Sequence, residues 1–157
     1  MNVLQTINLK KYYGTEPNIT RALDGVNLSV EQGEFVAVVE TSGSGKSTLL
    51  NMMGGLDTPT SGSVIVRGDE LAKKSDEELT IFRRRNIGFI FQNYNLVPIL
   101  NVCENIVLPV GLDGDVLGLL KRTSMEFNQS IVMITHNNEI AQLVDRIVRI
   151  EDGKIVE

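Results

Sequence analysis

The chain has little of what builds disulfide frameworks and membrane spans. Its 157 residues include no tryptophan, one cysteine, one histidine and four prolines. Because the single thiol, Cys103, excludes an internal disulfide, the composition is typical of a reducing cytosol. No stretch reaches the roughly 18 consecutive apolar residues of a membrane helix, and the N-terminus lacks the pattern of a signal peptide. We therefore expect any membrane role to come through a partner.

An excess of positive charge is also missing. Lysine and arginine total 15 against 20 aspartates and glutamates, for a net charge of −5. This balance gives no electrostatic footprint for nucleic acid, and the triplet Arg83–Arg85 is expected to be a solvated helix face. The length, the hydrophobic fraction of 42% and the charged fraction of 22% are typical of one ordinary globular domain.

One stretch organises the rest of the chain. The apolar run Phe35–Val39 predicts a buried strand, and Leu49–Met53 predicts a helix. Between them lie Ser42, Gly43, Ser44, Gly45, Lys46, Ser47 and Thr48. A strand, a glycine-rich turn and a helix start predict a phosphate cradle, because free backbone N–H groups and the helix dipole converge on an anion. We expect Lys46 to reach the β- and γ-phosphates and the Ser47 hydroxyl to coordinate Mg²⁺.

One position departs from the phosphate-loop pattern G-x-x-x-x-G-K-[ST]. Its first glycine falls at Glu40, which puts a carboxylate at the rim of an anion site. At roughly 5 Å and an effective dielectric of about 20, one like-charge pair costs about 3 kcal/mol, on the order of 100-fold in affinity. A Glu40 side chain turned to solvent costs much less. The alternative, a Gly/Ser linker, does not explain why a buried strand and an apolar helix flank the stretch.

Expected strands and helices alternate along the chain. The strands are Val3–Leu9, Ala22–Val30, Phe35–Val39, Ser63–Arg67, Ile87–Phe91, Ile131–Thr135 and Arg146–Ile150, with a closing hairpin at Asp152-Gly153. One helix is expected after the phosphate loop and a second after the Ser75–Glu78 capping box. Three more are expected at Val102–Val107, Asp113–Phe127 and Asn138–Leu143. In Asp113–Phe127 the apolar positions at near-helical spacing are Val116, Leu119, Leu120 and Met125. This alternation predicts an α/β domain with a largely parallel sheet.

Four motifs in this order resemble the nucleotide-binding domain of ABC transporters. They are the phosphate loop, Ile90-Phe91-Gln92 as a Q-loop, Ile134-Thr135-His136 as a switch histidine, and Asp152-Gly153-Lys154-Ile155. Three further segments look closest to the lipoprotein-releasing and macrolide-export branch: Gly54–Asp57, Pro59–Gly62 and Arg84–Phe91. The resemblance covers the chain as one truncated domain, with residues 1–110 as its N-terminal core and 111–157 as its C-terminal core.

The resemblance implies a P-loop NTPase-like fold with a largely parallel sheet flanked by helices and an N-terminal antiparallel part. It implies ATP and Mg²⁺ as ligands, with His136 at the γ-phosphate and Gln92 at the metal through water. Tyr13 would stack on adenine, Tyr12 being the competing choice. It also implies ATP hydrolysis coupled to a membrane permease, a paired domain, and a peripheral cytoplasmic place on the inner face of the cell membrane.

Two family features do not occur in the chain. Family members carry a helical subdomain with an L-S-G-G-Q signature, then an apolar strand ending in the Mg²⁺-binding Asp and the catalytic Glu. Here Glu104–Val110 passes almost directly to Asp115–Leu120. The run Ile106–Val110 before Asp113 mimics that acidic strand, but Pro109 argues against a central strand. We expect weak or absent nucleotide binding and negligible hydrolysis.

The missing strand belongs between Ile87–Phe91 and Ile131–Thr135, so its loss leaves unpaired strand edges. We expect those two strands to pair directly, or the chain to form a homodimer or strand-exchanged oligomer. Two other interpretations stay open. One is a catalytically dead remnant or engineered fragment that acts as a folded scaffold. The other is a small P-loop kinase, for which Arg83–Arg85 is the available arginine cluster.

Overall fold

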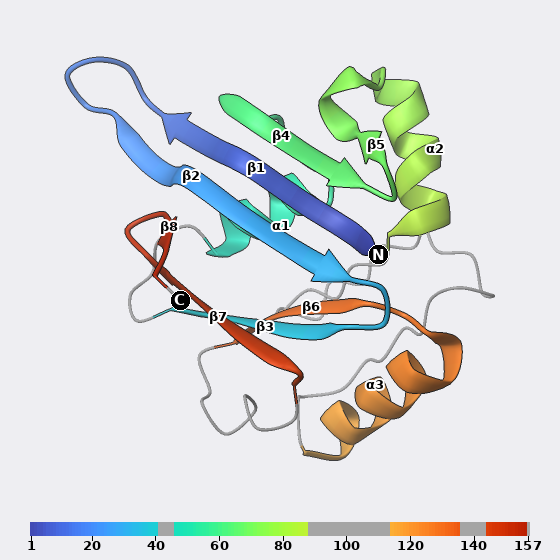
Figure 1. The fold of residues 1–157 in the computed structure, drawn as a ribbon. Coiled ribbons are helices and arrows are strands. Elements are labelled where there is room, and N and C mark those ends of the chain that lie inside the picture. The colour runs from blue at the N-terminus through green and yellow to red at the C-terminus, as the bar shows by residue number, and fades with distance from the viewer. Residues whose placement is uncertain (41–45, 88–113, 136–143, 157) are drawn as a thin grey trace.

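A computed structural model describes the fold over residues 1–40, 46–87, 114–135 and 144–156 (Figure 1). These residues form two β-sheets, three α-helices and one 3-10 helix. Among the described residues, no helix is long and apolar enough to cross a membrane.

The first sheet is antiparallel and begins at the N-terminus. Its strands are β1 (Asn2–Tyr13), β2 (Thr20–Glu31), β4 (Ser61–Val66) and β5 (Asp69–Glu70), in the order β2-β1-β4-β5. β1 pairs with β2 on one side and with β4 on the other (Figure 1). The antiparallel N-terminal part is therefore confirmed, and β1 continues four residues beyond the predicted end, to Tyr13.

The second sheet is mostly parallel. Its strands are β3 (Phe35–Glu40), β6 (Ile131–Thr135), β7 (Arg146–Glu151) and β8 (Lys154–Ile155), in the order β6-β3-β7-β8. β3 lies between β6 and β7 and runs parallel to both. β8 folds back antiparallel on β7, and Asp152 and Gly153 between them have φ of 47° and 75°. The predicted closing hairpin is confirmed.

β3 is buried on both faces because each face packs against a different layer. Val36 and Val38 belong to the main core, which includes residues of both sheets and of the first α-helix. Phe35 and Ala37 belong to a second cluster with Met133, and Leu120 packs against it. Two buried faces explain why this strand is a continuous apolar run.

The helices are α1 (Lys46–Met53), α2 (Asp76–Asn86), α3 (Gly114–Phe127) and the 3-10 helix η1 (Leu71–Lys73). Ser75 caps α2: its Oγ accepts the Glu78 N–H at 3.2 Å, and the Glu78 carboxylate accepts the Ser75 N–H at 2.8 Å. The capping box is confirmed. Arg84 and Arg85 at the end of α2 are exposed as predicted, whereas Arg83 donates a hydrogen bond to the Gly55 carbonyl at 2.5 Å.

The predicted apolar face of α3 needs one correction. Met125 is 75% exposed, so its assignment to the apolar face of the helix was wrong. Leu120, Thr123 and Ser124 have the i, i+3, i+4 spacing of one helix face, and Leu120 packs against the core while the other two are buried. Met125 lies one residue further round the helix, which turns it away from that face.

Several predictions fall outside the described residues. They are most of the strand Ile87–Phe91 and the helices Val102–Val107 and Asn138–Leu143. The proposed pairing of Ile87–Phe91 with β6 is therefore not tested. Within the described part of the chain, the ladder partner of β6 is β3.

Candidate nucleotide-binding site

The carboxyl ends of β3, β6 and β7 meet at one edge of the second sheet. Val39 is in register with Thr135 of β6 and with Arg149 of β7. Ligands of open α/β sheets bind at the carboxyl ends of the strands, so the chemistry is expected at this edge. The strand that leads into the predicted phosphate loop is thus the central one, and His136 directly follows Thr135.

α1 begins at Lys46, so Lys46, Ser47 and Thr48 form its first turn. The N–H groups of a first turn have no partner within the helix, and the helix dipole there favours an anion. Leu49, Met52 and Met53 are at most 3% exposed and hold the helix against the core. The helix ends at Met53 before the two glycines, as predicted, and its last turn is completed by the Gly54 N–H donating to the Leu50 carbonyl at 2.9 Å.

The predicted phosphate loop is described at its two ends. Ser42, Gly43, Ser44, Gly45, Gln92 and His136 lie outside the described residues. Lys46 and Ser47 are placed by their helical backbone, and Glu40 by its backbone as the last residue of β3, in register with Ile150. The loop is therefore bounded by a strand end and a helix start, as the pattern predicts, and the roles of these side chains stay predictions.

The two adjacent tyrosines at the end of β1 have different surroundings. The Tyr12 hydroxyl donates to the Asp24 carboxylate at 2.5 Å, and the Arg21 guanidinium lies 5.5 Å from the centre of the Tyr12 ring. Tyr13 is 43% exposed, and its hydroxyl donates to Asp57 at 3.3 Å. Of the two, Tyr13 is the more exposed residue, which favours it as the partner of a base.

Two residues beside Tyr13 were not predicted from the sequence. The Lys11 ammonium donates to the Asp57 carboxylate at 3.0 Å and to the Thr58 carbonyl at 2.7 Å. It also lies 5.1 Å from the centre of the Tyr13 ring. Burial raises the pKa of Asp57, but the hydrogen bonds from Lys11 and the Thr58 N–H outweigh it and leave the pKa below its ordinary value. The carboxylate is thus held in its charged form.

Among the described residues, no group of three or more His, Cys, Asp or Glu side chains could hold a metal ion. The predicted Mg²⁺ ligands are Ser47 and Gln92. Ser47 lies in the first turn of α1 and its side chain is not described, and Gln92 lies outside the described residues.

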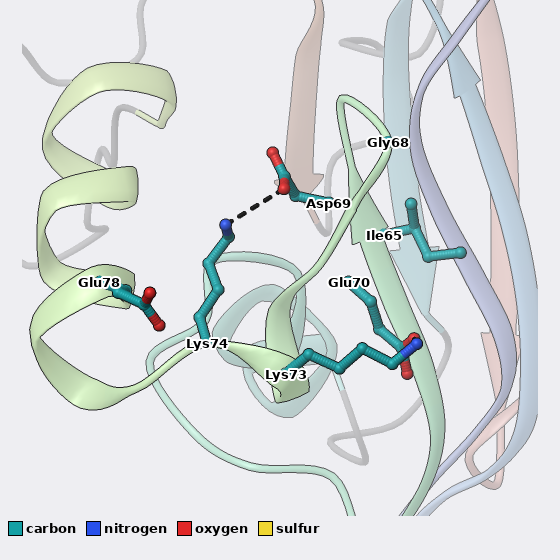
Figure 2. Close-up of a pocket in the computed structure, with 7 residues that line it drawn as sticks. All are labelled: Ile65, Gly68, Asp69, Glu70, Lys73, Lys74 and Glu78. Atoms are coloured by element: carbon teal, nitrogen blue, oxygen red, sulfur yellow. Dashed lines mark hydrogen bonds and ion pairs between the residues drawn. The ribbon is translucent and has the colours of Figure 1, made fainter.

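A groove of about 410 Å³ lies away from this edge, beside the first sheet (Figure 2). Its lining residues are Ile65, Gly68, Asp69, Glu70, Lys73, Lys74 and Glu78. Figure 2 shows Lys74 directed at Asp69, at 3.1 Å, and the Lys73 ammonium lies 2.8 Å from Glu70. Both lysines are neutralised within the groove, and none of the predicted site residues lines it, so we assign it no ligand.

Comparison with known proteins agrees with the fold. Residues 23–154 match the protein family described as ABC transporter. Bacitracin export ATP-binding protein BceA of Halalkalibacterium halodurans is 44% identical over 112 residues, covering 71% of this chain and 44% of BceA. Macrolide export ATP-binding/permease protein MacB of Mannheimia succiniciproducens is 30% identical over 223 aligned positions, covering 100% of this chain and 34% of MacB.

Among solved structures, the ATP-binding cassette MJ0796, a dimer bound to ADP and Pi, superposes with a TM-score of 0.83 at 27% identity. That match covers 98% of this chain and 97% of the other. The chain spans less than half the length of the curated relatives that it matches, 44% and 34% in the two cases above. The family match covers most of the chain, and the fold is that of an ATP-binding cassette, so the chain belongs to the ABC transporter family.

Proposed function

We propose that the chain is an internally shortened ATP-binding subunit of a bacterial ABC export transporter, with impaired nucleotide binding and negligible hydrolysis. The observation that carries the proposal is the edge where β3 ends at Glu40 and α1 begins at Lys46, beside the carboxyl end of β6. The export role is supported by the similarity to BceA, a bacitracin export ATP-binding protein, and to MacB, a macrolide export ATP-binding/permease protein.

In this proposal each predicted residue has one role at the nucleotide. The N–H groups of Ser42–Gly45 and of the first turn of α1, up to Thr48, hold the phosphates, and Lys46 contacts their charge. Tyr13 stacks on adenine, and His136 contacts the γ-phosphate. The first turn of α1 is a fitting place for an anion.

Mg²⁺ would be held by the Ser47 hydroxyl and, through water, by Gln92. It would neutralise charge on the phosphates; it keeps several waters in protein sites, so two protein ligands suffice for weak binding. Ser47 fits this role by its place in the first turn of α1, next to Lys46. In this proposal the metal-binding Asp and the catalytic Glu of the family have no counterpart in the chain, because Pro109 argues against a central strand before Asp113.

The internal shortening is supported by the alignment with MacB. That alignment has 223 positions, and the chain that it covers completely has 157 residues, so the alignment contains gaps on the side of this chain. Hydrolysis depends on positioned charge around the transferred phosphoryl group and the attacking water. A chain without the acidic strand lacks two of the groups that do this, which is why we propose negligible turnover.

The partners follow from the family. We propose a membrane permease as the partner that places the chain at the cytoplasmic face of the membrane. A homodimer or strand-exchanged oligomer is proposed for the edge of β6 that faces away from β3. MJ0796 is described as dimeric, which supports pairing of cassettes. The alternative is a folded remnant with no enzymatic role, which the gapped alignment also favours.

The test measures Mg-ATP binding by calorimetry and phosphate release for the wild type, Lys46→Ala and Lys73→Ala. Lys73 lies in the separate groove and is the matched control. We expect weak binding that Lys46→Ala abolishes and Lys73→Ala preserves, with no phosphate release above background. Phosphate release that Lys46→Ala abolishes would contradict the proposed impairment. Equal binding in wild type and Lys46→Ala would contradict the phosphate loop as the site.

A further inference from the structure

The end of β1 is joined to the connection between α1 and β4 by a small charged cluster. Lys11 and Tyr13 come from β1, and Asp57 and Thr58 come from the connection; their hydrogen-bonded pairs lie 44 to 47 residues apart in sequence. β1 and β4 are neighbours in the first sheet (Figure 1), and the Thr60 hydroxyl accepts the Tyr12 N–H at 2.9 Å. The cluster is therefore supported by strand pairing and by the hydrogen bond between Tyr12 and Thr60.

Lys11 is held more tightly than a surface lysine. Its side chain is 14% exposed, and its ammonium donates to the Asp57 carboxylate and the Thr58 carbonyl at 3.0 and 2.7 Å. With both bonds made, the ammonium stands 5.1 Å from the centre of the Tyr13 ring, within the range of a cation–π contact. One cation is thus fixed against the ring.

Asp57 holds the other end of the same ring. Its Oδ2 accepts the Tyr13 hydroxyl at 3.3 Å, a long hydrogen bond, and its Oδ1 accepts the Thr58 N–H at 2.7 Å and the Lys11 ammonium. The ring is therefore restrained at its hydroxyl by an anion and at its centre by a cation. Tyr13 as a whole is 43% exposed, which leaves the residue accessible to a partner from solution.

We propose that Lys11 and Asp57 are positioning residues that orient the Tyr13 ring for the aromatic base of a nucleotide. The inference rests on the proposed function, because it needs a nucleotide held by the predicted phosphate loop. Base–aromatic stacking tolerates every base, so the cluster sets affinity for the base as a class. Loss of the cluster should lower the affinity for nucleotides and leave unchanged the affinity for a ligand that has phosphates and no base.

Tyr12 supplies a matched control within the same strand. Its hydroxyl also donates to a carboxylate, Asp24, at 2.5 Å, and a cation, Arg21, also lies near its ring. The two clusters share their chemistry and differ in the exposure of the tyrosine. Asp24→Asn should therefore disturb Tyr12 and leave nucleotide affinity unchanged, whereas Asp57→Asn should act on Tyr13 and on nucleotide affinity.

The first measurement needs no ligand. The chain has three tyrosines, so NMR of ¹³C-labelled tyrosine can follow each ring. We expect Asp57→Asn and Lys11→Met to shift and average the Tyr13 ring signals, and Asp24→Asn to move those of Tyr12. Unchanged Tyr13 signals in Asp57→Asn and Lys11→Met would overturn the proposal, because the cluster would then not restrain the ring.

The second measurement compares Mg-ATP with Mg-tripolyphosphate by calorimetry, in the wild type and in the Glu40→Gly background. We expect Tyr13→Leu to lower the affinity for Mg-ATP about 5- to 150-fold, because one base stack is lost. Asp57→Asn and Lys11→Met should each lower the affinity for Mg-ATP by about 3- to 10-fold, which is the effect of a lost hydrogen bond. Lys11→Arg should lower this affinity less than Lys11→Met does. Tripolyphosphate affinity should stay the same in all four variants.

The outcomes separate the two proposals. If Tyr13→Leu lowers the affinity for ATP but neither Asp57→Asn nor Lys11→Met does, the positioning role is wrong and the proposed function stands. If Asp57→Asn weakens ATP and tripolyphosphate equally, its role is structural and the inference is also wrong. If neither the wild type nor Glu40→Gly binds ATP, the proposed function fails together with the inference.

Discussion

Val39 on β3 and Thr135 on β6 are register partners in a parallel ladder. On its other side Val39 pairs with Arg149 of β7, so three strands end together. The sequence of the chain then places the predicted phosphate loop directly after one of these strands and His136 directly after another. Two motifs that lie almost a hundred residues apart therefore start from one edge of the sheet.

Leu49 in α1 should carry much of the stability of the helix that begins the proposed site. It is 0% exposed, whereas Leu56 beyond the helix is 45% exposed. We expect Leu49→Ala to lower the free energy of unfolding by about 2–5 kcal/mol through the cavity that it leaves, and Leu56→Ala to change it by less than about 1 kcal/mol. Urea denaturation measures both. Equal losses would contradict the packing of α1 against the core.

Gly62 should be more sensitive to substitution than Gly68, although both have a left-handed backbone, with φ of 83° and 87°. A Cβ at Gly62 would lie 2.3 Å from the Asn8 carbonyl oxygen of β1, whereas a Cβ at Gly68 meets nothing within 4 Å. We expect Gly68→Ala to cost about 1–2 kcal/mol for its backbone alone, and Gly62→Ala about 1–3 kcal/mol more. Equal costs in thermal unfolding would show that β1 and β4 are not packed this closely.

Glu34 should make stability depend on acid pH. Burial raises the pKa of its carboxyl, but hydrogen bonds from Arg146 and the Glu31 N–H, at 2.7 and 2.8 Å, outweigh this and hold the pKa below its ordinary 4.5. Because the folded pKa is the lower one, this contribution is present above the unfolded pKa and lost as pH falls through the folded pKa.

The measurement compares the wild type with Glu34→Gln by urea denaturation from pH 7 downward. We expect the wild type to be the more stable at pH 7, and the difference to shrink as the pH falls below about 4.5. Glu16 is an exposed residue of the β1–β2 connection, and Glu16→Gln is the control for replacing a carboxylate by an amide. A difference between wild type and Glu34→Gln that stays constant with pH would contradict the ion pair's role.

Features that depend on neighbouring residues could be predicted from the sequence. The capping box of Ser75 and Glu78 and the hairpin turn at Asp152-Gly153 are both local, and both are confirmed. The central strand was also predictable, because a strand buried on both faces is apolar at every position. The resemblance then supplied the fold class, a largely parallel sheet with an N-terminal antiparallel part, which the fold comparison confirms.

Features that depend on distant pairing could not be predicted in the same way. The contact of Lys11 with Asp57 joins residues 46 apart and depends on the register of β1 with β4, which shifts between Ile7 and Lys10. An irregularity of this kind changes which side chains share a face and leaves no periodic signal. Met125 was misplaced for a related reason: apolar spacing alone did not show which face of α3 packs on the sheet.

Glu40 is the residue of the predicted phosphate loop on which the proposed impairment of nucleotide binding depends. The residue ends β3, one step before the predicted phosphate loop, where the pattern has glycine. The most direct test is calorimetric titration of the wild type and Glu40→Gly with Mg-ATP, with Lys46→Ala in each background as the blank. We predict that Glu40→Gly binds on the order of 100-fold more tightly than the wild type, the cost of one like-charge pair at the phosphates. Equal affinities in the two proteins would contradict the account.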